Sequence, residues 1–221
     1  MREVPGPGPV LACLPGLQGD ARVFEDFARA SGRRTLLFDL PAGSPRRAGF
    51  LLATRVPTWL EGSADWLTGS FGGLVLRTLP ESCVRSAAVV ASLPGPELIR
   101  RRTRVQASAL AALPPPLVAV SYRAHLRRAL AADGVPPPVV ARITRRGLDP
   151  DVLRDRLEGV LRWDVAPPPA TPFVTVLGDD DPQARWSDDA VSGPVIRVPG
   201  GHRPWCSHPQ ALLDALAPLW A

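Results

Sequence analysis

The chain contains no lysine. All 26 basic residues among its 221 residues are arginine, and its formal net charge is +5 at pH 7. A basic chain raises the question of nucleic-acid binding. However, the densest basic run, Arg100–Arg104, has no aromatic residue on which a base could stack, and the other arginines are scattered. Because net charge alone bears on solubility and weak non-specific association, we expect no nucleic-acid partner.

Cysteine is also scarce. Cys13, Cys83 and Cys206 lie far apart and form no C-x-x-C pair, which argues against a disulfide framework and against a zinc site of standard spacing. Cys13 belongs to an apolar run and is expected to be a small buried residue. Cys206 is close to His202 in sequence, so a Cys–His nucleophile pair is an alternative, although nothing places Cys206 on a nucleophile turn. We expect it to lie on the approach to the last helix.

Long apolar runs are missing as well. No stretch of about 18 uncharged apolar residues occurs, and residues 1–9 lack the apolar region of a secretory signal. Mean hydropathy is +0.03. These observations predict a soluble, cytoplasmic globular protein without membrane insertion, large enough for one domain or for a core with a cap. They do not determine its oligomeric state.

Short apolar runs alternate with helical patterns near both ends of the chain. The expected strands cover residues 10–14, 35–38, 64–68, 87–91, 173–177 and 195–198. Mostly apolar strands that alternate with helices indicate an α/β fold, with a mostly parallel sheet covered by helices on both faces. The sheet is expected to begin at the strand of residues 10–14.

The middle of the chain has a different character. Residues 93 to about 168 show helical patterns broken by three proline triplets and contain no convincing strand. Asp149 and Pro150 together mark a helix start. We therefore divide the chain into an α/β core of residues 1–92 and 169–221 and a helical cap of residues 93–168, inserted at the edge of the sheet where ligands bind.

One serine lies in a turn that suits a nucleophile. Ser70 stands in Leu67-Thr68-Gly69-Ser70-Phe71-Gly72-Gly73, between an apolar run and a helical pattern. A strand-to-helix elbow exposes a serine hydroxyl and directs the amide of the next residue, Phe71, toward a developing oxyanion. Thr68 stands where the first glycine of the G-x-S-x-G pattern is usual. A structural Ser/Gly turn without chemistry is the alternative.

Three further turns follow expected strands, and parallel strands would bring them to the edge where Ser70 lies. They are Pro15-Gly16-Leu17-Gln18-Gly19, Gly178-Asp179-Asp180-Asp181-Pro182 and Gly200-Gly201-His202. With Ser70, these turns supply a nucleophile, a carboxylate and an imidazole base, which are the three groups of a catalytic triad. They follow one another in the chain order serine, aspartate, histidine. The aspartate run lacks the spaced oxygen ligands of a calcium loop, so we expect no metal site. His125 and His208 are expected to take no part in the chemistry.

These turns resemble those of the α/β-hydrolase superfamily, and the likeness extends over nearly the full length of the chain. It is strongest to small bacterial esterase-like members, in which a Leu-Pro-Gly-Leu-Asp-Gly-type loop follows the first strand. This chain has Leu14-Pro15-Gly16-Leu17-Gln18-Gly19, then Ser70-Phe71-Gly72-Gly73, Gly178-Asp179-Asp180-Asp181-Pro182 and Pro199-Gly200-Gly201-His202 at the corresponding places. The stretch from Val152 to Val165 is similar to the last cap helix of that group.

The resemblance implies a role for each matched residue. Ser70 is the expected nucleophile, His202 the general base and then acid, and Asp181 the carboxylate that orients it, with Asp179 and Asp180 as alternatives. The amides of Leu17 and Phe71 are expected to form the oxyanion hole. The implied activity is that of a carboxylesterase-like serine hydrolase acting on a small ester or thioester without a cofactor. An acyltransferase with the same triad and a non-catalytic ligand-binding protein are the alternatives.

Overall fold

The computed structural model describes residues 1–145, 147–167, 173–181, 191 and 193–220. Its described strands form one sheet in the order β1-β3-β2-β4-β5-β6-β7. Strands β2 to β7 pair in parallel, and β1 pairs antiparallel with β3. The strand bounds are β1 (Arg2–Val4), β2 (Leu11–Leu14), β3 (Thr35–Leu37), β4 (Ala64–Gly69), β5 (Val84–Val90), β6 (Phe173–Gly178) and β7 (Val195–Val198). The expected fold class is confirmed.

The expectation that the sheet begins at residue 10 is wrong. Strand β1 pairs with β3 at the edge of the sheet, with Arg2 opposite Leu37 and Val4 opposite Thr35. It is only three residues long and precedes the segment Pro5–Pro9, which is rich in proline and glycine. A run this short shows too little alternation to be identified as a strand, so β1 becomes visible only through its pairing partner.

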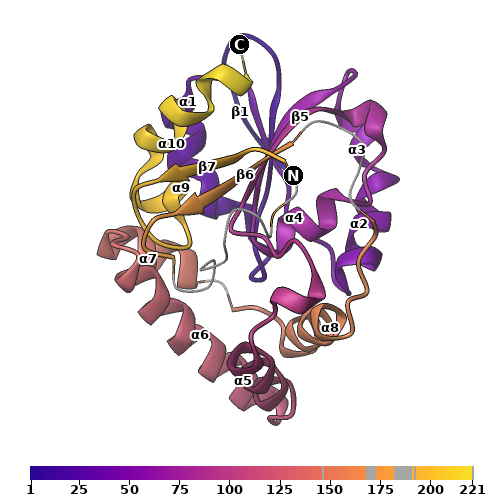
Figure 1. Cartoon of the computed structure of the whole chain (residues 1–221), viewed down its shortest axis with the longest axis vertical. Coiled ribbons are helices and arrows are strands. Elements are labelled where there is room, and N and C mark those ends of the chain that lie inside the picture. The colour runs from indigo at the N-terminus through magenta and orange to yellow at the C-terminus, as the bar shows by residue number, and fades with distance from the viewer. Residues whose placement is uncertain (146, 168–172, 182–190, 192, 221) are drawn as a thin grey trace.

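Helices cover both faces of the sheet (Figure 1). One face packs against α1 (Glu25–Ser31), α9 (Pro204–Ser207) and α10 (Pro209–Leu216), and the other against α2 (Pro45–Ala53), α3 (Val56–Trp59) and α4 (Phe71–Leu76). Each face has its own cluster of buried apolar side chains. The described part of the chain also contains short 3₁₀ turns. They are η1 (Ala21–Phe24), η2 (Glu81–Cys83), η3 (Pro96–Leu98) and η5 (Ala217–Leu219).

The described residues between β5 and β6 include four α-helices, which lie together below the sheet in Figure 1. They are α5 (Arg101–Ala111), α6 (Pro115–Ala132), α7 (Pro137–Arg145) and α8 (Pro150–Leu161). Proline suits the first helical turn, where its missing N–H would have had no acceptor. The Asp149 carboxylate accepts a hydrogen bond from the Asp151 amide at 2.9 Å, which confirms the expected helix start. The proposed core–cap boundary at 168/169 lies outside the described residues.

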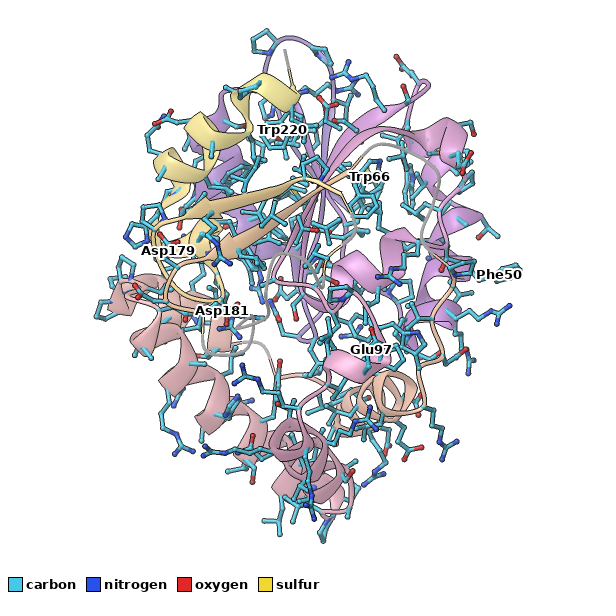
Figure 2. All side chains as sticks on the ribbon, in the orientation of Figure 1. Phe50, Trp66, Glu97, Asp179, Asp181 and Trp220 are labelled. Atoms are coloured by element: carbon cyan, nitrogen blue, oxygen red, sulfur yellow. The ribbon has the colours of Figure 1, made fainter. Side chains whose placement is uncertain are left out.

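The opposite end of the sheet contains a buried carboxylate near the start of β4. Asp65 has no exposed side-chain surface and accepts hydrogen bonds from Arg33 at 2.6 Å, Arg85 at 2.8 Å and Ser86 at 2.7 Å. Burial alone would raise the pKa of Asp65, but these donors outweigh it and hold the pKa below its ordinary value. Beside it, Trp66 fills the interior and donates its indole N–H to the Cys83 carbonyl at 3.0 Å (Figure 2).

Among the described residues, no helix combines the length and the apolar character needed to cross a membrane.

Candidate active site

Four loops meet at one edge of the sheet because the strands before them run in parallel. The register pairs Leu14 of β2 with Thr68 of β4, and Gly178 of β6 with Val198 of β7. The loops after these strands carry the Pro15–Gly19 turn, Ser70, Asp181 and His202. The expectation that all four turns share an edge is therefore confirmed.

Ser70 occupies the tight turn between β4 and α4. Its backbone has φ 50° and ψ −112°, a left-handed conformation that a non-glycine residue adopts only at a cost of about 1–3 kcal/mol. The Ser70 amide donates to the Val90 carbonyl at 2.7 Å, which anchors the turn to the neighbouring strand. Such strain persists only where the surrounding structure enforces it, and it is a recurrent property of functional sites.

The small residues around Ser70 are needed at two specific positions. A Cβ atom on Gly69 would lie 2.5 Å from Cη2 of Trp205, and one on Gly72 would lie 2.5 Å from the Leu14 carbonyl oxygen. Thr68, by contrast, is a fully buried strand residue, and its Oγ1 has no hydrogen-bond partner within the described chain. The Trp205 ring therefore requires glycine at position 69 and the Leu14 backbone requires it at position 72, whereas position 68 accommodates a threonine.

His202 and Asp181 form a buried pair. Nδ1 of His202 lies 2.8 Å from Oδ2 of Asp181, and their side chains are 7% and 0% exposed. Asp179 and Asp180 are exposed, and neither forms a hydrogen bond with His202 in the described part of the chain. Because Nδ1 is engaged with the carboxylate, Nε2 is the ring nitrogen left to exchange a proton. Figure 2 labels Asp179 and Asp181 on the loop after β6, close to the cap.

Ser70 and His202 line the same cavity, whose volume is about 110 Å³. The described residues around it are Gly16, Leu17, Gln18, Ser70, Tyr122, His125, Leu126, His202, Arg203 and Trp205. Leu17, expected in the oxyanion hole, is therefore in the cavity wall, and Asp181 is connected to the cavity through His202. Phe71 lies next to Ser70 in the chain, but its side chain is buried on the other face of the sheet and does not line this cavity.

The two amides expected to form the oxyanion hole lie in tight backbone turns. The Gly19 amide donates to the Gly16 carbonyl at 2.9 Å, and Gly19 has φ +72°. Phe71 is the first residue of α4, where helix amides lack acceptors within the helix. In the described residues, neither the Leu17 nor the Phe71 amide donates a hydrogen bond to another protein group.

The cap contributes residues that the sequence patterns did not identify. Tyr122, His125 and Leu126 of α6 line the catalytic-edge cavity, although His125 was expected to take no part in the chemistry. Burial lowers the pKa of His125, and the positive charges of Arg203 and Arg128 lower it further. The signal that could have identified this wall is the spacing of Val118, Tyr122, Leu126 and Leu130, which recur every four residues and are all buried.

A residue at the end of α6 holds the loop that carries His202. Asp133 accepts a hydrogen bond from the His202 amide at 3.2 Å and forms an ion pair with Arg203 at 2.8 Å. A Cβ atom on Gly201 would lie 2.2 Å from Oδ1 of Asp133, so the Asp133 carboxylate packs closely against the Gly201 backbone. No local sequence pattern connects Asp133 with a loop about 70 residues away.

The Cys–His alternative is not supported by the position of the thiol. Cys206 lies in α9, as expected, and its Sγ donates to the Val23 carbonyl at 3.4 Å. Burial raises the pKa of the Cys206 thiol to about 12, so the reactive thiolate is not populated at neutral pH. Cys13 is fully buried in β2, as expected for a small core residue.

No model of a known protein family matches the chain, and no curated protein matches it. Solved structures match it over almost its whole length. An α/β-hydrolase fold protein from Burkholderia ambifaria has a TM-score of 0.68 at 20% identity, covering 98% of this chain and 92% of that one. A thermophilic esterase from Thermogutta terrifontis has a TM-score of 0.70 at 15% identity, covering 97% and 90%. A bottromycin epimerase has a TM-score of 0.72 at 17% identity, covering 100% and 94%.

Likeness at such low identity shows the fold alone. Together with the parallel sheet, the two helical layers and the loops at one sheet edge, it leads to one conclusion. This chain has the α/β-hydrolase fold.

Proposed function

We propose that the protein is a serine hydrolase that cleaves a carboxylic ester or thioester through Ser70, His202 and Asp181. The observation that carries this proposal is the buried His202–Asp181 pair, joined at 2.8 Å, in the wall of the cavity that Ser70 also lines. The left-handed backbone of Ser70 supports it, because the turn pays a conformational cost that a purely structural Ser/Gly turn would not need.

In the first half of the proposed reaction, Ser70 Oγ attacks the substrate carbonyl carbon. Nε2 of His202 takes the hydroxyl proton, and the Asp181 carboxylate stabilises the resulting imidazolium. The carbonyl oxygen becomes an oxyanion, which the amides of Leu17 and Phe71 bind. Collapse of the tetrahedral intermediate breaks the bond to the alcohol or thiol, which leaves with the proton from His202. Ser70 is then acylated.

In the second half, water takes the place of the leaving group. His202 removes a proton from the water, and the hydroxide attacks the acyl carbon of the Ser70 ester. The same two amides bind the second oxyanion. When this intermediate collapses, the carboxylic acid leaves and the proton on His202 returns to Ser70 Oγ. The proposed reaction uses no cofactor.

Cavity size indicates a small substrate. The volume of about 110 Å³ beside Ser70 is well below the 300–1,000 Å³ of a common ligand pocket. A second cavity of about 260 Å³ shares Gln18, Tyr122 and Leu126 with the first, so the side chains of α6 separate the two. We therefore propose short acyl groups as the preferred substrates, with Tyr122 and Leu126 limiting the chain length.

Acyl transfer and non-catalytic ligand binding are the alternatives. Acyl transfer would use the same acylated Ser70, with an alcohol or amine in place of water. The structural likeness to an epimerase shows that this fold accommodates functions other than ester hydrolysis. An intact set of nucleophile, base and carboxylate around one cavity favours catalysis over simple binding.

The test is labelling by a fluorophosphonate probe together with hydrolysis of p-nitrophenyl esters from acetate to decanoate. We expect the wild-type protein to be labelled and to prefer short esters. Ser70→Ala should abolish labelling and reduce kcat by about 10⁵- to 10⁶-fold, because the nucleophile is lost. Ser207→Ala is the matched control, since Ser207 lies in the same region but outside the cavity wall.

Each outcome distinguishes the candidate functions. Wild-type protein that is neither labelled nor active would refute the serine hydrolase. Labelling that persists in Ser70→Ala would assign the nucleophile to another residue. Wild-type labelling with rapid acyl transfer to added alcohols and slow release of acid would favour the acyltransferase.

A further inference from the structure

A buried arginine from the cap reaches the loop that carries Leu17. Arg156 lies on α8 and is 1% exposed. Its Nη1 donates to the Leu17 carbonyl at 2.6 Å, and its Nη2 donates to the carbonyls of Leu40 at 2.9 Å and Pro41 at 3.0 Å. The guanidinium thus connects the last cap helix with the loops after β2 and β3.

These partners are unusual for a buried arginine. In the described part of the chain, Arg156 forms no ion pair with a carboxylate, and its Nε has no hydrogen-bond partner. Burial lowers the pKa of Arg156 to about 10, so the group remains charged at neutral pH. A buried charge without a carboxylate partner costs free energy, and an apolar side chain would fill this space at a lower cost. Packing alone therefore does not account for an arginine here.

The guanidinium contacts both residues that we propose for the oxyanion hole. The guanidinium also packs against Gly19 so closely that a Cβ atom there would lie 2.4 Å from Nη1. Any larger residue at position 19 would therefore displace Arg156. Its Cζ stands 5.7 Å from the centre of the Phe71 ring, within reach of a cation–π contact. The hydrogen bond to the Leu17 carbonyl fixes the peptide plane that follows Leu17, and so restricts the backbone of a residue that lines the cavity.

We propose that Arg156 is a positioning residue. It holds the Pro15–Gly19 turn, the oxyanion loop, in the geometry needed for the reaction at Ser70. This inference rests on the proposed serine hydrolase. Preorganised donors stabilise an oxyanion only when they are fixed before charge develops, because otherwise the loop must reorganise during the reaction. Arg156 fixes Leu17 from outside the cavity and does not touch the substrate carbonyl.

The test compares Arg156→Met with Arg154→Met. Arg154 is on the same helix and also donates to two backbone carbonyls, those of Ala111 and Leu113, but these lie within the cap. We expect Arg156→Met to lower kcat for the best ester by about 10- to 100-fold with KM changed less than about threefold, because misplaced catalytic groups cost this much. Arg154→Met should leave both constants near their wild-type values.

A second readout separates positioning from a merely structural role. A trifluoromethyl ketone with the acyl group of the best ester forms a tetrahedral adduct with a serine nucleophile, and its oxyanion uses the same amides. We expect its inhibition constant to weaken in Arg156→Met by the same factor as kcat falls. Arg156→Lys keeps the charge, but its single ammonium nitrogen cannot reproduce the planar two-nitrogen geometry of these bonds, so it should fall between the wild type and Arg156→Met.

The outcomes keep the two proposals apart. Wild-type protein without Ser70-dependent labelling removes the proposed function itself. Active wild-type protein together with a folded Arg156→Met variant of normal kcat and normal ketone affinity overturns the role of Arg156 alone. If Arg156→Met does not fold, Arg156→Lys decides: unchanged kcat and ketone affinity there refute the positioning role, and a matched loss in both supports it.

Discussion

Two buried carboxylates lie at opposite ends of the parallel strands and have different partners. Asp65, near the start of β4, is held by Arg33 and Arg85, whose charges are permanent, and by Ser86. Asp181, after the end of β6, is bonded to the imidazole of His202. Both side chains have no exposed surface. The two sites therefore share burial and differ in whether the partner can exchange a proton.

This difference separates a structural site from a site suited to chemistry. A carboxylate saturated by guanidinium groups stays ionised, and its ion pairs tie β4 to β5 through Arg85 and to the segment before β3 through Arg33. A carboxylate bonded to an imidazole leaves a second ring nitrogen available for proton transfer. The sheet polarity accounts for the placement, because ligands reach parallel sheets at the carboxyl ends of their strands. Mutations at the two aspartates should thus affect stability in one case and activity in the other.

Of the changes at the two aspartates, Asp181→Asn is expected to have the largest effect. The amide would favour the wrong tautomer of His202, so kcat should fall by about 10⁴-fold with little change in thermal stability. Steady-state ester hydrolysis and thermal unfolding measure the two quantities. Asp179→Asn is the matched control, since this neighbouring carboxylate is exposed and should leave kcat unchanged. Equal activity of the two variants would contradict the role proposed for Asp181.

Asp65→Asn is expected to have a smaller effect, which lowers stability and leaves activity unchanged. Removing the charge leaves Arg33 and Arg85 facing a neutral group, which should lower the free energy of unfolding by about 3 kcal/mol. The folded variant should keep the wild-type kcat, because Asp65 is at the start of β4 and Ser70 follows the end of that strand. Urea unfolding and ester hydrolysis test both statements. Asp151→Asn, which alters an exposed pair with Arg154, should have no measurable effect on either.

The smallest effect concerns acid stability. Because the pKa of Asp65 is lowered on folding, its contribution is fully present above the unfolded-state pKa of about 3.9 and is lost as pH falls through the lower folded value. The stability difference between wild type and Asp65→Asn should therefore be constant from pH 7 to about pH 5 and shrink below about pH 4. Urea midpoints across this range measure it. A difference that does not change down to pH 3 would show that the ion pairs do not account for the loss.

Local patterns were sufficient for most of the core. Strands such as Leu11–Leu14 and Val195–Val198 are short apolar runs ended by glycine or proline, so their positions follow from composition and spacing. The Ser70 turn and the His202 turn were also predictable, because small residues after a strand mark sharp reversals of the chain. The choice of Asp181 among three adjacent aspartates rested on the family resemblance and not on a local pattern, since neighbouring residues in a turn point in different directions.

The remaining features depend on contacts between distant segments. Arg156 reaches Leu17 across 139 positions, and Asp133 reaches His202 across 69. A helix pattern shows that α8 has a buried face, but it does not show which loop that face meets. Strand β1 is a similar case, because three residues become a strand only beside β3.

The sequence by itself determined the alternation of strands and helices, the inserted helical segment and the chain order of serine, aspartate and histidine. These depend on local propensity and on the period of apolar residues, which act over a few neighbours. The tertiary structure alone decided that Asp181 meets His202, that α6 lines the cavity beside Ser70 and that Arg156 bonds to the Leu17 carbonyl. Such contacts depend on how whole elements pack, and packing brings together side chains that no local pattern connects.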